Sequence, residues 1–207
     1  MIIQYSTILI DMYGVILKEP KGRFLDYARS VLTDDDFARA DELIHKERLF
    51  DKASLGEINA SEFFERLGLD DSSPHTKRYI DNYLTLDEEF IRFAESVKGR
   101  YELVLLSNDL SEWSEYICEK WDLNKYFKDK IVSASVSCRK PDLKIFDLAL
   151  ERIGRSPYEC IFVDNRPENL ASAEEVGIAP FLFDRNNEAH YYGATVFSFD
   201  ELLNYIG

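Results

Sequence analysis

Five polar residues at three places in the sequence have side chains that could do chemistry, and they are Asp11, the pair Ser107 and Asn108, and the pair Asp164 and Asn165. Each place comes directly after a short apolar run. A carboxylate can serve as a nucleophile or a ligand of a divalent cation, and hydroxyl or amide groups can hold a developing oxyanion. Singly, such residues often cap helices or form turns, but their shared position indicates one site.

Four short apolar runs are predicted to be buried parallel strands, because each is brief and ends abruptly at a polar residue. They span residues 7–10, 103–106, 160–163 and 180–183. Helical patterns lie between them at 111–121, 143–153 and 168–176. This alternation predicts an α/β fold with a doubly wound, mostly parallel, Rossmann-like sheet, in which ligands bind at the carboxyl ends of the strands.

The stretch 19–83 departs from the alternation, because it contains only helical patterns, at 24–32, 35–50 and 60–67. We therefore predict two domains. Residues 1–18 and 84–207 form the core domain, and residues 19–83 form a helical domain inserted into it. Pro20 and Gly22, which favour a turn, mark the first boundary.

The composition limits the class of partner. The chain has 207 residues and a net charge of −14, so nucleic acid and anionic membrane surfaces would be repelled, and a small molecule is the expected partner. An anionic substrate would then need a local cation or a bound metal ion, and Lys140 is the candidate cation.

The expected compartment is the cytoplasm. Three cysteines are an odd number without paired spacing, and no run is long enough to span a membrane. The apolar segment 1–10 lacks the features of a signal peptide and is predicted to be a strand. The sequence is compatible with both a monomer and a homodimer.

Four segments in this order resemble the motifs of the haloacid dehalogenase-like hydrolase superfamily. They are Ile-Leu-Ile-Asp-Met-Tyr-Gly-Val at 8–15, Leu-Leu-Ser-Asn at 105–108, Arg-Lys-Pro-Asp at 139–142 and Phe-Val-Asp-Asn-Arg-Pro-Glu-Asn at 162–169. One such segment alone would be weak, whereas four in sequence over nearly the whole chain are specific.

The resemblance implies a role for each residue. Asp11 is the nucleophile, Lys140 is the cation that steadies the reaction, and Tyr13 lies beside them as a catalytic residue. Ser107 and Asn108 hold the substrate.

The resemblance also implies Mg²⁺ as the cofactor. Its ligands would be the Asp11 carboxylate, the backbone carbonyl of Tyr13 and a side chain of the pair Asp164 and Asn165.

The helical insertion resembles a cap domain that closes over the site and selects the substrate. Leu-Gly-Glu-Ile at 55–58, followed by Glu-Phe-Phe at 62–64, is similar to the cap of sugar-phosphate phosphatases and of the phosphatase domain of epoxide hydrolases. Closure would expel water and strengthen charge interactions inside the site.

Two positions differ from the phosphatase pattern of this superfamily. Tyr13 stands where those phosphatases carry a second aspartate as general acid and base, a role typically worth about 10²–10⁴-fold in rate. Asn165 stands where they carry a metal-binding aspartate. With a tyrosine at the first of these positions, the chain resembles the 2-haloacid dehalogenases, which need no metal.

Three functions follow from this mixed pattern. The first is a Mg²⁺-dependent phosphatase of attenuated activity, which acts on a small phosphorylated metabolite through an aspartyl-phosphate at Asp11. The second is a metal-free 2-haloacid dehalogenase. The third is a protein that binds a phosphorylated ligand without turnover.

Overall fold

A computed structural model of the chain describes residues 5–70 and 72–207, so the first four residues of the strand predicted at 1–10 lie outside it. In this part of the chain six parallel strands form one sheet in the order β3-β2-β1-β4-β5-β6. The strands are β1 (Thr7–Ile10), β2 (Glu102–Ser107), β3 (Phe127–Val132), β4 (Cys160–Asp164), β5 (Ala179–Phe183) and β6 (Ala194–Val196). The predicted doubly wound parallel sheet is confirmed.

The two strands that the apolar runs do not predict, β3 and β6, are the edges of the sheet. Only the last two residues of β3 are buried, and β6 is three residues long with one buried residue. Edge strands bury less surface and therefore show no continuous apolar run.

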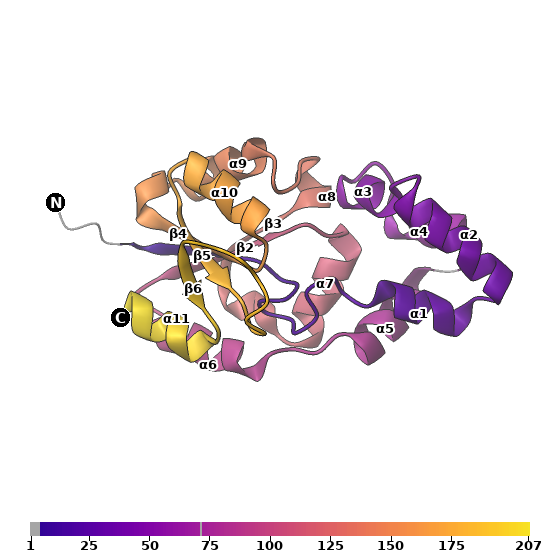
Figure 1. The fold of residues 1–207 in the computed structure, drawn as a ribbon, viewed down its shortest axis with the longest axis horizontal. Coiled ribbons are helices and arrows are strands. Elements are labelled where there is room, and N and C mark those ends of the chain that lie inside the picture. The colour runs from indigo at the N-terminus through magenta and orange to yellow at the C-terminus, as the bar shows by residue number, and fades with distance from the viewer. Residues whose placement is uncertain (1–4, 71) are drawn as a thin grey trace.

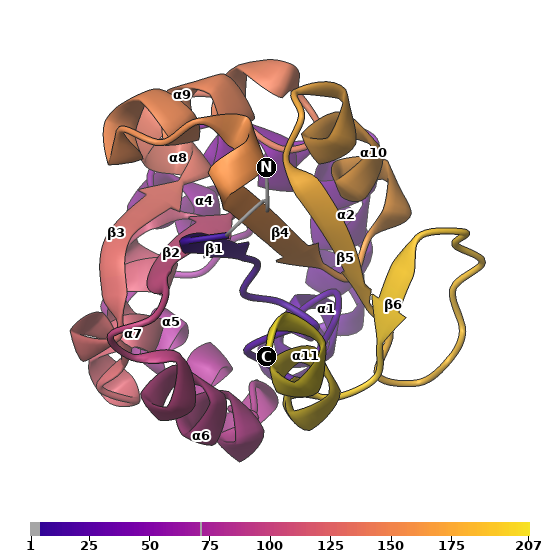
Figure 2. The same cartoon turned by 90° about the vertical axis from the view of Figure 1, so that its left-hand side faces the viewer.

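Helices cover both faces of the sheet (Figure 2). They are α6 (Glu88–Val97), α7 (Ser111–Lys120), α8 (Ser133–Val136), α9 (Leu143–Ile153), α10 (Pro167–Glu175) and α11 (Phe199–Ile206), with short 3₁₀ turns at Leu123–Lys125 and Pro157–Glu159. The faces have separate cores, because successive strand side chains point in opposite directions. Ile8 packs in the core below α6, α7 and α11, whereas Leu9 packs in the core below α9 and α10.

Five further helices lie together beyond the carboxyl ends of the strands, on the side away from the C-terminus (Figure 1). They are α1 (Phe24–Val31), α2 (Asp34–His45), α3 (Leu49–Ser54), α4 (Ala60–Arg66) and α5 (Ser72–Tyr83). Local signals start two of them: the Thr33 hydroxyl caps α2, and Asn59 and Glu62 form a capping box at α4. No helix in the described residues is long and apolar enough to cross a membrane.

The single helix predicted at 35–50 is wrong. The structure has two helices there, α2 and α3, separated at Arg48, whose φ of 54° is left-handed. A left-handed residue ends the α-helical hydrogen-bond pattern, and because it is an arginine rather than a glycine, no sequence signal marks the break.

An aromatic cluster joins the helical insertion to the core. Trp113 of α7 is fully buried, and its ring centroid lies 4.8 Å from that of Tyr79, 5.3 Å from that of Phe24 and 5.7 Å from those of Phe50 and Phe63. All four partners belong to the insertion. Such ring pairs add about 0.5–1.5 kcal/mol each beyond their buried area, so the insertion is firmly docked on α7.

Candidate active site

The strand order places the candidate site. The connections from β1 to β2 and from β4 to β5 run in opposite directions along the sheet, and ligands of open α/β sheets bind where this direction reverses. Asp11 follows β1 and Asp164 ends β4, so the two carboxylates lie on either side of that point.

A buried lysine connects these two carboxylates. The Lys140 ammonium donates to Asp11 Oδ1 at 2.7 Å, to Asp164 Oδ2 at 2.8 Å and to the Leu106 carbonyl at 2.7 Å. Lys140 is 2% exposed. Its three donors are all used, and the triad of one cation and two anions keeps a net charge of −1 in a buried place.

The loop that carries Asp11 is held closely against β4. Asp11 N donates to the Val163 carbonyl at 2.9 Å, and Gly14 has a left-handed φ of 82°. A Cβ at Gly14 would lie 2.3 Å from Asn165 Nδ2, so only glycine lets the loop approach Asn165.

Asn108 fixes the backbone of Lys140. Its side chain accepts from Lys140 N and donates to Lys140 O, both at 2.8 Å. The side chain predicted to hold the substrate therefore also positions the lysine, although it lines the cavity as well. Ser107 is fully buried, and its hydroxyl has no hydrogen-bond partner among the described residues.

Asp164 and Asn165 differ in the acceptors they leave free. Asp164 Oδ1 accepts from Arg166 N at 2.8 Å, while Oδ2 accepts from Lys140 and from Asn169 Nδ2 at 3.0 Å. Asn165 Oδ1 is buried and has no partner among the described residues. A buried oxygen without a partner costs free energy, and Asn165 Oδ1 is the oxygen of this pair that no described group satisfies.

The donor set suits Mg²⁺, although it is not a cluster of acidic side chains. Within the described residues no group of three His, Cys, Asp or Glu side chains is arranged to hold a metal. The predicted ligands are instead the Asp11 carboxylate, the Tyr13 backbone carbonyl and a carboxylate or amide oxygen of the pair Asp164 and Asn165, and Mg²⁺ accepts oxygen ligands of all these kinds together with water.

The Tyr13 hydroxyl points away from the triad. It donates to Asp109 Oδ1 at 3.3 Å, and Asp109 also accepts from Ser114 Oγ at 2.7 Å. Asp109 is fully buried and was not predicted from the sequence. Its position one residue after Asn108 is the signal that could have indicated it.

Burial perturbs the ionisation of the site. It raises the pKa of Asp11 to about 6, with Lys140 opposing and Asp164 adding to the shift. Burial also raises the pKa of Asp109 to about 7, against the hydrogen bond from Ser114. Burial and the nearby Asp109 hold the pKa of Tyr13 well above its usual range. For Lys140, burial alone would lower the pKa, but the two carboxylates raise it above its ordinary value.

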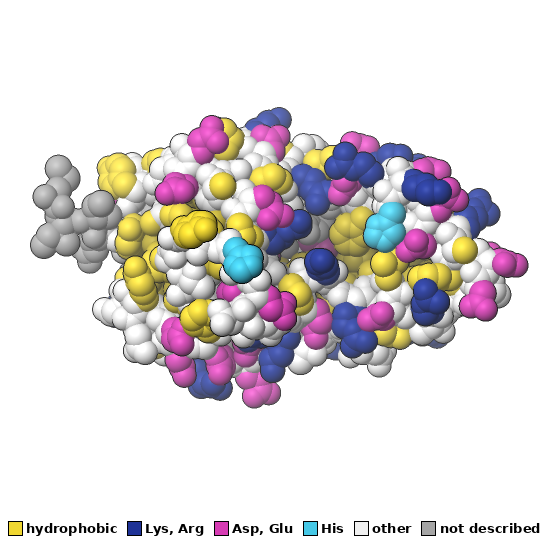
Figure 3. Space-filling view, in the orientation of Figure 1, with side chains coloured by type: hydrophobic (Ala, Val, Ile, Leu, Met, Phe, Trp, Pro, Cys, Tyr) yellow, Lys and Arg dark blue, Asp and Glu magenta, His cyan; other side chains and the backbone are white. Residues whose placement is uncertain are grey.

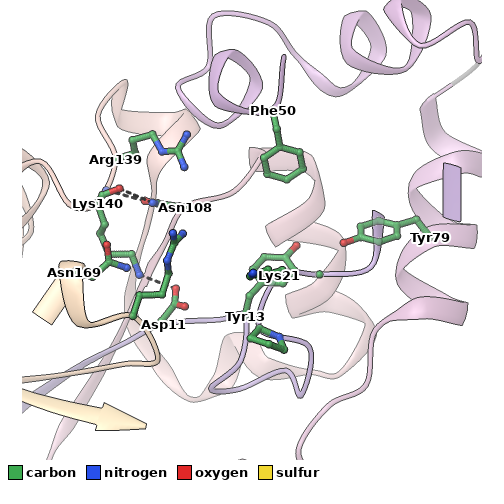
Figure 4. A pocket seen from close by; sticks show the side chains of 12 residues that line it. Asp11, Tyr13, Lys21, Phe50, Tyr79, Asn108, Arg139, Lys140 and Asn169 are labelled. Carbon is green, nitrogen blue, oxygen red and sulfur yellow. Dashed lines mark hydrogen bonds and ion pairs between the residues drawn. The ribbon is translucent and has the colours of Figure 1, made fainter. Parts of the chain in front are cut away.

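A cavity of about 200 Å³ lies over the triad (Figure 4). Its inner end is formed by Asp11, Lys140, Asn108 and Asn169, and helical-insertion residues Phe50 and Tyr79 lie across from them. The remaining lining residues are Tyr13, Pro20, Lys21, Gly22, Arg139 and Arg166. Of these lining residues, only Asp11, Tyr13, Asn108 and Lys140 were predicted to act in the site. Arg139, Arg166 and Asn169 lie within the motif segments without a predicted role.

Comparisons with known proteins show similarity in sequence and in fold. D-ribitol-5-phosphate phosphatase of Bacteroides thetaiotaomicron is 25% identical over 188 residues, which cover 85% of this chain and 90% of that protein. A HAD phosphatase from Thermococcus onnurineus superposes with a TM-score of 0.75 at 22% identity and 98% coverage of each chain. A HAD-family enzyme of B. thetaiotaomicron, in complex with magnesium and inorganic phosphate, superposes with a TM-score of 0.76 at 20% identity, covering 89% of this chain and 96% of that one.

The family assignment rests on most of the chain. Residues 5–177 match the sequence model of a family described as haloacid dehalogenase-like hydrolase. This range contains β1 to β4 and all three residues of the triad. The predicted resemblance is confirmed: the chain belongs to the haloacid dehalogenase-like hydrolase family and is a phosphatase-like hydrolase.

Proposed function

We propose that this protein is a Mg²⁺-dependent phosphatase that acts on small phosphate monoesters, with Asp11 as the nucleophile. The observation that carries the proposal is the buried triad in which Lys140 joins Asp11 and Asp164 and leaves a net charge of −1. Asn165, the residue after Asp164, adds a side-chain oxygen that has no hydrogen-bond partner among the described residues. The relative that acts on D-ribitol 5-phosphate supports the same reaction type.

The residues that would hold Mg²⁺ are Asp11, through its carboxylate, Tyr13, through its backbone carbonyl, and Asn165, through Oδ1. When bound, the ion would neutralise charge on the phosphoryl oxygens. An amide carries no charge, so this set would bind Mg²⁺ more weakly than one with a second carboxylate.

In the first step the Asp11 carboxylate forms a bond to phosphorus while the bond from phosphorus to the ester oxygen breaks, and an aspartyl-phosphate results. Lys140 holds Asp11 in place and stabilises negative charge on the phosphoryl group. The leaving oxygen takes a proton from water, because the Tyr13 hydroxyl donates to Asp109. In the second step water attacks the phosphorus and frees Asp11.

The second step explains the attenuated rate that we propose. The attacking water must lose a proton, and Tyr13 cannot take it, because a neutral phenol is a very weak base and its pKa is raised further by burial and Asp109. Water or free phosphate must remove that proton instead.

We further propose that residues 19–83 act as a cap over the cavity, with the core at 1–18 and 84–207. Phe50 and Tyr79 support this role, because they bring insertion side chains to the cavity opposite Asp11. The cytoplasmic location and the choice between monomer and homodimer stay predictions.

Asp11→Asn tests the proposed function. An amide is similar in size but a far weaker nucleophile, so we expect phosphate release from small esters at millimolar Mg²⁺ to fall at least 10³-fold, an order-of-magnitude estimate, while circular dichroism is unchanged. Asp129→Asn, which changes a partly buried carboxylate on β3, is the matched control.

The alternatives give different results in the same assay. Chloride release from 2-chloropropionate without Mg²⁺ would establish a dehalogenase. Phosphate ester binding without any turnover in the wild-type protein would establish a binding protein.

A further inference from the structure

The cavity is lined by more basic side chains than acidic ones. Among its lining residues Lys21, Arg139, Lys140 and Arg166 are basic, and Asp11 is the one carboxylate. Figure 3 shows the same feature from outside, with Lys and Arg side chains gathered around the hollow between the core and the helical insertion. In a chain of net charge −14, this local excess needs an explanation.

Two of the four cations are already matched. Lys140 lies between two carboxylates, and Arg166 forms an ion pair with Glu168 at 2.7 Å. These two cations are therefore compensated before any ligand binds.

The positive charges of Arg139 and Lys21 are not fully compensated. Arg139 pairs with Asp51 of α3, but Asp51 also pairs with Arg48 at 2.5 Å, so one carboxylate is shared by two guanidinium groups. Lys21 forms no ion pair within 4.0 Å among the described residues.

Arg139 is also well placed. Figure 4 shows its guanidinium extending from the loop of Lys140 toward the side of the cavity where Phe50 lies, away from Asp11. One Nη donates to Asp51, and a guanidinium has five N–H donors in a planar fork that matches a carboxylate. Only about a quarter of its side chain is exposed, which weakens competition from water.

We propose, on the basis of the phosphatase function above, that the substrate is a small phosphate monoester that carries a carboxylate on its leaving group, and that Arg139 binds this carboxylate. The size of the cavity fits such a ligand, because about 200 Å³ is less than the roughly 300–1,000 Å³ of sites for drug-sized molecules. Lys21, which also lines the cavity, adds positive charge to it.

A matched pair of esters tests the proposal. 3-Phosphoglycerate and sn-glycerol 3-phosphate share a three-carbon skeleton and differ in a carboxylate against a hydroxymethyl group. We expect kcat/KM to favour 3-phosphoglycerate by about tenfold or more, since a hydrogen bond to a charged group contributes roughly 1.5–3 kcal/mol.

Variants then assign the preference to a residue. Arg139→Gln should bring the ratio of the two kcat/KM values close to one. Asp51→Asn, which frees the guanidinium, should raise it. Arg152→Gln removes one positive charge from an ion pair on α9 and should leave the ratio unchanged. If Arg139 only attracted anions in general, Arg139→Gln would lower kcat/KM for both esters equally. An unchanged ratio in Arg139→Gln therefore overturns the proposal.

Binding separates this proposal from the proposed function. Calorimetry on Asp11→Asn, with and without Arg139→Gln, measures affinity for both esters without turnover. If wild-type protein hydrolyses neither ester, the phosphatase function fails, and the carboxylate preference is then decided by these affinities. If it hydrolyses both equally, the carboxylate site fails and the phosphatase function stands. If Arg139→Gln fails to fold, Asp51→Asn decides. The kcat/KM ratio of the two esters must then rise in Asp51→Asn, and an unchanged or lower ratio contradicts the carboxylate site.

Discussion

The two ends of the cavity are built in different ways. At the inner end the polar atoms of Lys140 and Asp164 are hydrogen-bonded to other core residues, and both side chains are almost fully buried. At the outer end Arg139 and Phe50 are partly exposed, and each contacts a residue on the other side of the boundary between the helical insertion and the core, Asp51 and Trp113 respectively. The inner end is thus fixed by the sheet, while the outer end depends on how the insertion docks.

This difference assigns a separate property to each end. Chemistry requires groups that do not move during the reaction, which buried, fully hydrogen-bonded side chains provide. Substrate choice requires groups that can be replaced without loss of the fold, which partly exposed side chains from a docked insertion provide.

The largest effect is expected at the inner end, from Lys140→Met. It leaves Asp11 and Asp164 buried without their cation, and breaking a buried ion pair costs about 3–5 kcal/mol. We expect the free energy of unfolding in urea to fall by that amount and phosphate release to become undetectable. Arg139→Gln, on the neighbouring residue, should cost about 1 kcal/mol or less, because its ion pair is partly exposed. Equal losses in the two variants would contradict the division into two ends.

The next effect concerns the two residues that differ from the phosphatase pattern. Tyr13→Asp should raise phosphatase activity on small esters by on the order of 10²-fold, because a carboxylate can act as acid and then as base. Asn165→Asp should raise it further by adding a charged metal ligand. The two changes should be more than additive, since proton transfer helps only when the phosphoryl group is correctly held.

Phosphate and chloride release by the wild type, both single variants and the double variant check this cycle, with Mg²⁺ titrated for each. Loss of chloride release without any gain in phosphate release would favour the dehalogenase. A flat result in both assays would favour a protein that binds without turnover.

The same contrast decides what the sequence could predict. Asp11 and Asp164 are predictable because buried strands are short apolar runs and their ends are the places where polar residues meet. Lys140 follows no strand and is predictable from its motif and from the need for a local cation. Arg139 lies within the third motif, yet nothing in its sequence neighbourhood indicates an ion pair with Asp51, 88 residues away. That contact depends on the docking of α3, which in turn depends on a helix break at Arg48 that no glycine marks.

The smallest effect is expected at the outer end, from Phe50→Ala. Phe50 lines the cavity opposite Asp11 and contacts Trp113 at 5.7 Å between ring centroids. Its removal widens the cavity without touching the triad, so kcat on a three-carbon ester should change little. The ratio of kcat/KM for ribitol 5-phosphate over sn-glycerol 3-phosphate should rise about tenfold, because one methylene group in a pocket changes discrimination by roughly 10–200-fold. Phe37→Ala, on α2 and partly buried but away from the cavity, is the matched control. An equal change in both variants would mean that Phe50 acts through the stability of the insertion and not through the space it occupies.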